Sequence, residues 1–182
     1  MTDHENWAGP LVSRLTELAK PEATDRAVLA HLRRGLCGPT DYTLARVGWL
    51  FRRVPDDGRG RALNSAVLAA GLFAWVKGTC PQNGGANFGR AFGHGLTDDA
   101  RKPREKRFTD LLDTDLTELL YKLRQAVTLV AGTGLDWVAL IRHLIHWDHP
   151  DRWVQKDWAR GFWAGHGADA EPDDAEAPAA AE

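Results

Sequence analysis

The chain has 182 residues, of which 43% are hydrophobic and 26% are charged, and its formal net charge is −2. This composition predicts one medium domain or two small ones with a packed core, and no apolar run approaches the roughly 18 residues of a membrane-spanning helix. The first ten residues do not have the pattern of a secretory signal, and Cys37 and Cys80 do not have metal-ligand spacing, so we expect a cytoplasmic protein with two reduced thiols and no membrane association.

Helical spacing of apolar residues dominates the first part of the chain, and no alternating strand pattern stands out. In the first predicted helix, for example, Leu11, Leu15 and Leu18 share one side. A turn at Pro55–Gly60 separates the third predicted helix from the fourth. The four helices predicted in this part are Trp7–Lys20, Glu22–Leu36, Asp41–Arg53 and Arg61–Lys77.

A glycine-rich stretch, Gly78–Gly95, follows the fourth helix. It lacks the phosphate-binding sequence G-x-x-x-x-G-K-[ST], and no predicted strand precedes it. We therefore predict a flexible connector with one short helix around Phe88–Phe92. Such a connector would bring backbone amides and Arg90 near a partner.

Helical patterns resume after the basic run Arg101–Arg107, at Glu105–Leu112, Asp113–Val130, Leu135–Trp147 and Pro150–Trp163. The second of these is the clearest, with one predicted buried face made of Leu116, Leu119, Leu120, Leu123, Val127 and Val130. The expected fold class is all-α. We predict two small helical bundles, residues 1–95 and 96–168, joined by a Gly-rich and basic connector and followed by a disordered acidic tail, residues 169–182.

Tryptophans are concentrated in the last two predicted helices. At 100° per residue, Trp137, Trp147 and Trp158 lie on the apolar sides, so we expect them in the core. Trp153 and Trp163 lie instead beside the three bases of the last helix. These two rings could stack on nucleic-acid bases, or they could pack on a neighbouring domain or subunit.

Three histidines at intervals of three raise the question of a metal site. His143, His146 and His149 have Asp148 and Asp151 beside them, and such ligands suit zinc, manganese or iron. The helix is expected to break near His149, however, and the chain has no H-E-x-x-H sequence. A metal-dependent phosphohydrolase that uses His143, His146 and Asp148 is therefore the alternative hypothesis. The leading hypothesis has no catalytic residue, metal or cofactor.

The net charge conceals an uneven distribution. Residues 169–182 hold six acids and no base, so the rest of the chain has 23 bases against 19 acids. Eight arginines fall within Arg26–Arg61, and the run Arg101–Arg107 holds five bases and one acid. Such clusters suit a polyanion partner. They also suit an ordinary solvated face, or the face of an adaptor that binds only proteins.

Several short motifs occur in an order that indicates a family. They are L-x-x-L-R-R-G at Leu29–Gly35, N-x-G-R-A at Asn87–Ala91, R-E-x-R-F-x-x-L-L at Arg104–Leu112, D-x-x-x-L-x-x-x-L-R at Asp115–Arg124, L-D-W at Leu135–Trp137, and W-A-R-x-F at Trp158–Phe162. With these motifs the chain resembles the CasB family, the small subunit of the type I-E CRISPR surveillance complex, Cascade. The loop departs from the family pattern, because Cys80–Asn83 stands where members often have a histidine and a glutamine.

The resemblance implies an all-α protein without catalytic activity. It implies two copies in a head-to-tail pair within the complex, in contact with other Cascade subunits. It also implies contact with the guide RNA, the single-stranded target DNA and the displaced non-target strand, which together form an R-loop. Guide pairing reads the sequence in such a complex, so the protein needs cations for phosphates rather than base-specific contacts.

The candidate phosphate-binding residues are the lysines and arginines of the basic clusters. Arg104 and Arg107 are the two most strongly indicated, and we expect about half of the whole set to form surface ion pairs instead. The full set is Arg33, Arg34, Arg52, Arg53, Arg90, Arg101, Lys102, Arg104, Arg107, Arg124, Arg142, Arg152, Lys156 and Arg160.

Overall fold

The computed structural model describes residues 6–22 and 25–164, whose regular secondary structure is helical. The all-α prediction is confirmed, and the predicted acidic tail lies outside the described residues. None of the helices in these ranges is long and apolar enough to cross a bilayer. The helices are α1 (Ala8–Ala19), α2 (Arg26–Gly35), α3 (Thr40–Val47), the 3-10 helix η2 (Gly48–Phe51), α4 (Arg61–Trp75), α5 (Phe88–Gly93), α6 (Asp98–Leu112), α7 (Leu116–Leu129), α8 (Trp137–Ile145) and α9 (Trp153–Ala164).

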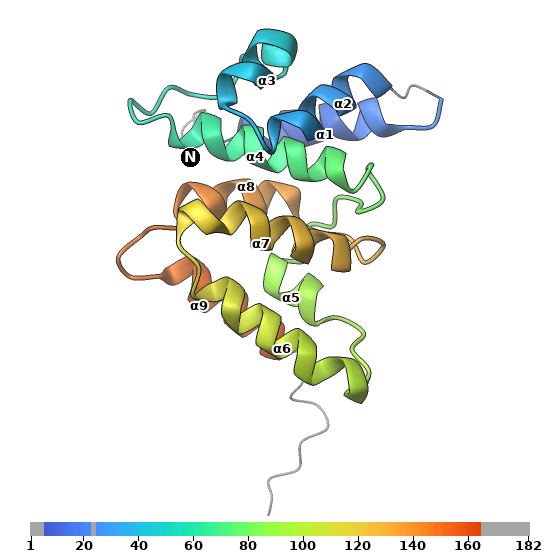
Figure 1. The fold of residues 1–182 in the computed structure, drawn as a ribbon, viewed down its shortest axis with the longest axis vertical. Coiled ribbons are helices and arrows are strands. Elements are labelled where there is room, and N and C mark those ends of the chain that lie inside the picture. The colour runs from blue at the N-terminus through green and yellow to red at the C-terminus, as the bar shows by residue number, and fades with distance from the viewer. Residues whose placement is uncertain (1–5, 23–24, 165–182) are drawn as a thin grey trace, which may run out of the picture.

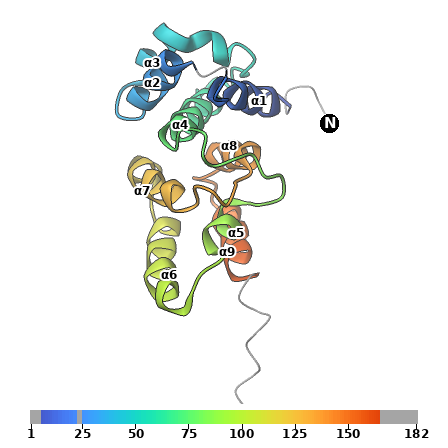
Figure 2. The ribbon, with the colours of Figure 1, turned by 90° about the vertical axis from the view of Figure 1, so that its right-hand side faces the viewer.

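The helices are stacked in three tiers (Figure 1). In the upper tier, α1, α2 and α3 surround α4, which also contacts α7 and α8 in the middle tier. The lower tier holds α5, α6 and α9. After a turn of 90°, α6 and α7 lie on one side of the molecule and α5 and α9 on the other (Figure 2). The contacting helices α6 and α7 therefore share one outer surface.

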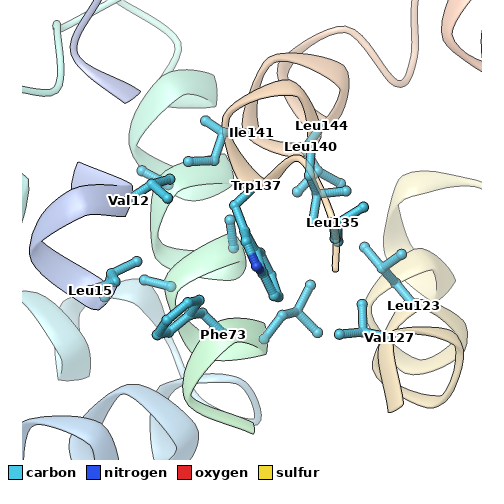
Figure 3. Close-up of a cluster of buried hydrophobic side chains, with 14 of the residues drawn as sticks. Val12, Leu15, Phe73, Leu123, Val127, Leu135, Trp137, Leu140, Ile141 and Leu144 are labelled. Atoms are coloured by element: carbon cyan, nitrogen blue, oxygen red, sulfur yellow. The ribbon is translucent and has the colours of Figure 1, made fainter. Parts of the chain in front are cut away.

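The core joins the upper and middle tiers. Trp137 of α8 lies beside Phe73 of α4, with ring centroids 5.3 Å apart (Figure 3). The indole Nε1 of Trp137 donates a hydrogen bond of 2.9 Å to the carbonyl oxygen of Cys80, so its buried polar group is satisfied. Side chains of α1 and α7 flank these rings in the same view: Val12, Leu15, Leu123 and Val127. The predicted division of the chain at residues 95 and 96 stays a prediction.

Three tryptophans are buried as predicted, with exposed fractions of 2% or less: Trp137, Trp147 and Trp158. The indole Nε1 of Trp147 donates to the carbonyl oxygen of Thr114 at 2.9 Å. Trp163 is 48% exposed and lies edge-on against the ring of Phe162, with centroids 5.0 Å apart. The positions assigned at 100° per residue therefore distinguished the buried tryptophans from the exposed ones.

Helices α5 and α9 approach each other so closely that their contact requires glycine. A Cβ atom on Gly89 would overlap the carbonyl oxygen of Trp158, and one on Gly161 would overlap Oδ1 of Asn87. Asn87 caps α5 by accepting a bond from a backbone N–H of its first turn. The same side chain donates to the carbonyl oxygen and to Oδ2 of Asp157, at 3.1 and 2.9 Å. Asn87 thus joins the two helices.

Helix α6 begins at Asp98, well before the predicted start at Glu105. Pro103 lies inside it and removes one backbone hydrogen bond, which is why the sequence pattern favours a later start. Further along the helix, Phe108 and Leu111 are each 1% exposed, and their burial stabilises the whole element. The basic run is consequently helical.

Two other expectations differ from the structure. The helix predicted at Asp41–Arg53 is divided, because α3 ends at Val47 and the chain continues as η2 from Gly48. Leu116 was expected in the core but is 46% exposed. It is the first residue of α7, and the buried face of this helix begins one turn later, at Leu119. The other residues of that predicted face are buried or half-buried.

The glycine-rich stretch is held by hydrogen bonds that the prediction of a flexible connector did not anticipate. The backbone N–H of Asn83 donates to the carbonyl oxygen of Leu135 at 3.0 Å. The Gln82 side chain donates to Oδ1 of Asp136 at 2.9 Å and accepts from the N–H of Trp137 at 2.8 Å. The segment before α5 is therefore tied to the start of α8.

We expect Asp136→Asn to destabilise the protein by about 1 kcal/mol at neutral pH, because a charged acceptor strengthens its hydrogen bonds. Partial burial raises the pKa of Asp136, but donors from Ala139, Gln82 and Gly85 outweigh it and leave the pKa below its ordinary 3.8. The ionised form is thus favoured by folding. Its contribution is complete well above pH 3.8 and is lost as the pH falls through 3.8 toward the folded-state pKa.

Denaturation of both proteins at several pH values measures this difference, which should shrink below pH 3.8. Asp115→Asn is the comparison for helix capping by itself: exposed Asp115 caps α7, and bonds from Thr117 and Glu118 lower its pKa too, so Asp136→Asn should show the larger loss because Asp136 also binds Gln82 and Gly85. A difference that is independent of pH would contradict the prediction.

Candidate nucleic-acid interface

A basic pocket lies between α6 and α7, and we call it the α6–α7 pocket. Its volume is about 410 Å³. Its lining includes exposed Arg107 and half-buried Lys122, together with the buried side chains of Phe92 and Ala126. The Lys122 ammonium donates to the backbone carbonyl of Asp110 at 3.0 Å, so its charge is held close to α6. Cations from two helices therefore meet at one hollow.

Arg104 lies next to this pocket and is partly engaged by the fold. Its guanidinium carbon lies 4.7 Å from the ring centroid of Phe92, and Nη1 donates to the carbonyl oxygen of Leu129 at 3.4 Å. Burial, together with the nearby charge of Arg107, lowers the pKa of Arg104, although a guanidinium stays charged at neutral pH. Arg104 therefore ties α6 to α5 and α7, while Arg107 is more open to a ligand.

Arg124 connects the pocket to the upper tier. Its guanidinium lies over Trp75 at 4.8 Å and over Tyr121 at 5.8 Å, and Nη1 approaches Sγ of Cys37 at 3.6 Å. Trp75 is fixed by a hydrogen bond of 3.1 Å from its Nε1 to Oγ1 of Thr128, yet it remains 41% exposed. An arginine between two exposed rings is a suitable surface for a single strand.

Sequence reasoning missed three members of this surface: Trp75, Tyr121 and Lys122. A usable signal was present in α7, where Tyr121 falls opposite the buried stripe of Leu119, Leu123 and Val127 and half-buried Lys122 lies at its border. A large aromatic on the polar side of an amphipathic helix marks a contact surface more often than a core position.

The predicted arginines of the first part lie elsewhere. Arg52 and Arg53 line a groove of about 530 Å³ between α1 and η2, together with Arg14, which was not predicted. Arg34 of α2 contacts the hydroxyl of Tyr42, with 3.4 Å from Nη1, and Arg33 is half-buried. Arg52 and Arg53 therefore belong to a second hollow, and none of these four predicted arginines lines the α6–α7 pocket.

The remaining predicted cations are spread over several helices. Arg152 is an ion-pair partner rather than a free cation, because Nη2 lies 3.4 Å from Oδ1 of Asp113 and donates to the carbonyl oxygen of Leu112 at 2.6 Å. Arg152 therefore ties the start of α9 to the end of α6. Exposed side chains on α5, α6, α8 and α9 include Arg90, Lys102, Arg142, Lys156 and Arg160, whereas Arg101 is half-buried.

The histidines form an aromatic contact instead of the arrangement that a metal site needs. Nδ1 of His143 accepts a hydrogen bond of 2.8 Å from Trp158, and the ring of Trp153 packs against His143 and His146 at centroid distances of 5.6 and 5.5 Å. Burial lowers the pKa of His143, although Asp157 opposes the shift. Within residues 6–22 and 25–164, no group of three His, Cys, Asp or Glu side chains is placed to hold a metal ion.

Comparison with known proteins identifies the family. The family model described as "CRISPR-associated protein Cse2" matches residues 28–163, well over half of the chain. The chain belongs to the Cse2 family. A Cse2 protein of Thermus thermophilus is 36% identical over 117 residues, which are 63% of this chain and 64% of that protein's length. The match thus spans a little under two thirds of the curated relative.

Solved Cse2-family structures have the same fold. A crystal structure of a Cse2-family protein from Thermus thermophilus matches with a TM-score of 0.70 and 30% identity, over 90% of this chain and 99% of that one. A crystal structure of CasB from M. ruber matches with a TM-score of 0.69 and 28% identity, over 91% and 95% of the two chains. The resemblance to the CasB family is confirmed.

The fold explains why two of the family motifs occur together in this Cse2 chain. Asn87–Ala91 supplies the capping asparagine and the close-contact glycine of α5, and Trp158–Phe162 supplies the facing surface of α9. Both motifs therefore serve the packing of two short helices, and Arg90 and Arg160 are their exposed members.

Proposed function

We propose that this Cse2 chain is the non-catalytic small subunit of a type I-E CRISPR surveillance complex. In that complex it would hold nucleic-acid strands by their phosphates and stabilise the R-loop. Membership of the family and the ordered motifs support the assignment to the complex. The observation that carries the binding role is the convergence of Arg107, Lys122 and Arg124 on the surface that α6 and α7 share.

The expected partners are the guide RNA, the single-stranded target DNA, the displaced non-target strand, other Cascade subunits and a second copy of the chain in a head-to-tail pair. A cation that neutralises a phosphate releases condensed counterions, so binding weakens as salt rises. Because the contacts go to phosphates, affinity varies little with sequence. No reaction is assigned to the chain, since the proposed role consists of holding strands that other groups pair or cleave.

We expect the double variant Arg104→Ala/Arg107→Ala to bind a single-stranded oligonucleotide roughly tenfold more weakly near 0.1 M salt. The slope of log affinity against log salt should also become shallower by about 1.4, which corresponds to two lost phosphate contacts on a single strand. Fluorescence anisotropy over a range of salt concentrations measures both quantities.

Arg104 contacts Phe92 and Leu129, so its removal also perturbs packing. The variant Arg107→Ala/Lys122→Ala removes two charges at the α6–α7 pocket without touching that contact, and it should give the same change in slope. Arg59→Ala/Arg61→Ala removes two exposed charges, one in the turn before α4 and one at its first residue, and is the control of equal net charge. Equal losses in all three variants would show a general charge effect and would contradict the assignment to α6 and α7.

A further inference from the structure

We propose that the α6–α7 pocket accepts an unpaired nucleobase of a single strand, an inference that rests on the proposed function and deepens it. Phosphate binding by itself needs only cations on an open face. Here the cations border a hollow of about 410 Å³, within the range of roughly 300–1,000 Å³ that is typical of small-ligand sites. Phe92 and Ala126 give this hollow a buried apolar wall, which a phosphate cannot use.

Tyr121 is the side chain placed to stack on such a base. It lines the pocket and is 60% exposed, although its ring is large and mostly apolar. The guanidinium of Arg124 lies 5.8 Å from the ring and also contacts Trp75, so Tyr121 belongs to an ordered cluster rather than standing alone. Stacking on an aromatic ring tolerates any base, which agrees with a protein that does not read sequence.

The polar groups around the pocket fit a nucleotide better than an apolar side chain of another protein. Arg107 and Lys122 offer positive charge to the phosphates on either side of the base. Gln125 offers an amide donor and acceptor to a base edge, and the Asp110 carboxylate can accept from an N–H group of a base, such as N3–H of thymine. An apolar peptide side chain would bring no anion to Arg107, and none to Lys122 beyond Glu118, with which Lys122 pairs at 4.0 Å.

The test compares two single strands of equal length, an oligothymidylate and a strand of the same phosphate number that carries abasic residues. The full chain should bind the base-containing strand about tenfold more tightly, as expected for stacking of a single base. Tyr121→Leu should lose this preference and bind the two strands with equal affinity. Tyr121→Phe keeps the ring and should restore the preference.

Trp163→Leu compares the loss of another exposed aromatic: Trp163 is 48% exposed on α9 and does not line the pocket, so this variant should keep the preference. Equal binding of both strands, with a normal salt dependence and no effect of Tyr121→Leu, overturns the base pocket and leaves the proposed function intact. Binding of neither strand at any salt concentration overturns both. Loss of a protein partner in Tyr121→Leu, with unchanged strand binding, assigns the pocket to a protein side chain and also overturns the inference.

Discussion

Replacing Trp158 with alanine is expected to lower the free energy of unfolding by about 3–5 kcal/mol, as is typical when a fully buried tryptophan is removed. Trp158 is 0% exposed and packs on Phe88 and Trp147, with ring centroids 4.5 and 5.0 Å away. Its loss opens a cavity between α5, α8 and α9 and leaves the ring of His143 without its donor. Chemical denaturation monitored by far-ultraviolet circular dichroism measures the change.

Trp163→Ala, five positions further along α9, is the matched control and should cost less than about 1 kcal/mol because the ring is half exposed. Trp158→Phe should fall between the two, since it keeps an apolar ring but loses the hydrogen bond to His143. Similar costs for Trp158→Ala and Trp163→Ala would refute the division of the tryptophans into core and surface.

Gly89→Ala is expected to destabilise the protein by about 3 kcal/mol or more, at the upper end of what overpacking costs. The added methyl group would overlap the carbonyl oxygen of Trp158, which belongs to a helix backbone and cannot rotate away. Relief requires α5 and α9 to separate, which would also strain the bonds from Asn87 to Asp157. The midpoint and slope of urea unfolding give the loss of stability.

Gly84→Ala adds the same methyl group five residues earlier, where no atom lies within 4 Å of the added carbon and the backbone does not have a positive φ. Its stability should stay within about 0.5 kcal/mol of the unsubstituted protein. An equally small change in the free energy of unfolding for Gly89→Ala would contradict the claim that the contact between α5 and α9 requires glycine at this position.

Helix positions were predictable because each amphipathic helix carries its own apolar stripe. The stripe of α7 and the inward positions of Trp137 and Trp147 follow from spacing alone. The failures have local causes. Pro103 lies inside α6 and made the start of that helix appear later than it is. At Gly48 the chain changes from an α-helix to the 3-10 helix η2, a change that the spacing of apolar residues does not reveal.

The candidate interface was only partly predictable. Arg104, Arg107 and Arg124 were singled out from motifs, and the structure places all three on the surface of α6 and α7. Arg152 was also predicted, from the basic side of the last helix rather than from a motif, yet it pairs with Asp113. The sequence does not show what a basic side chain contacts. Only the packing of the helices decides whether it faces a backbone carbonyl, a carboxylate or solvent.

The amino-acid sequence by itself determined the all-α class, the family and the inward face of most helices, because these depend on residue order and on the 3.6-residue period. The tertiary structure decided which distant residues meet. It placed Tyr121 and Lys122 of α7 beside Arg107 of α6 around one pocket, and it brought Gly89 against Trp158. Both outcomes depend on how helices cross in space, and that geometry is set by the packing of the whole core rather than by any local pattern.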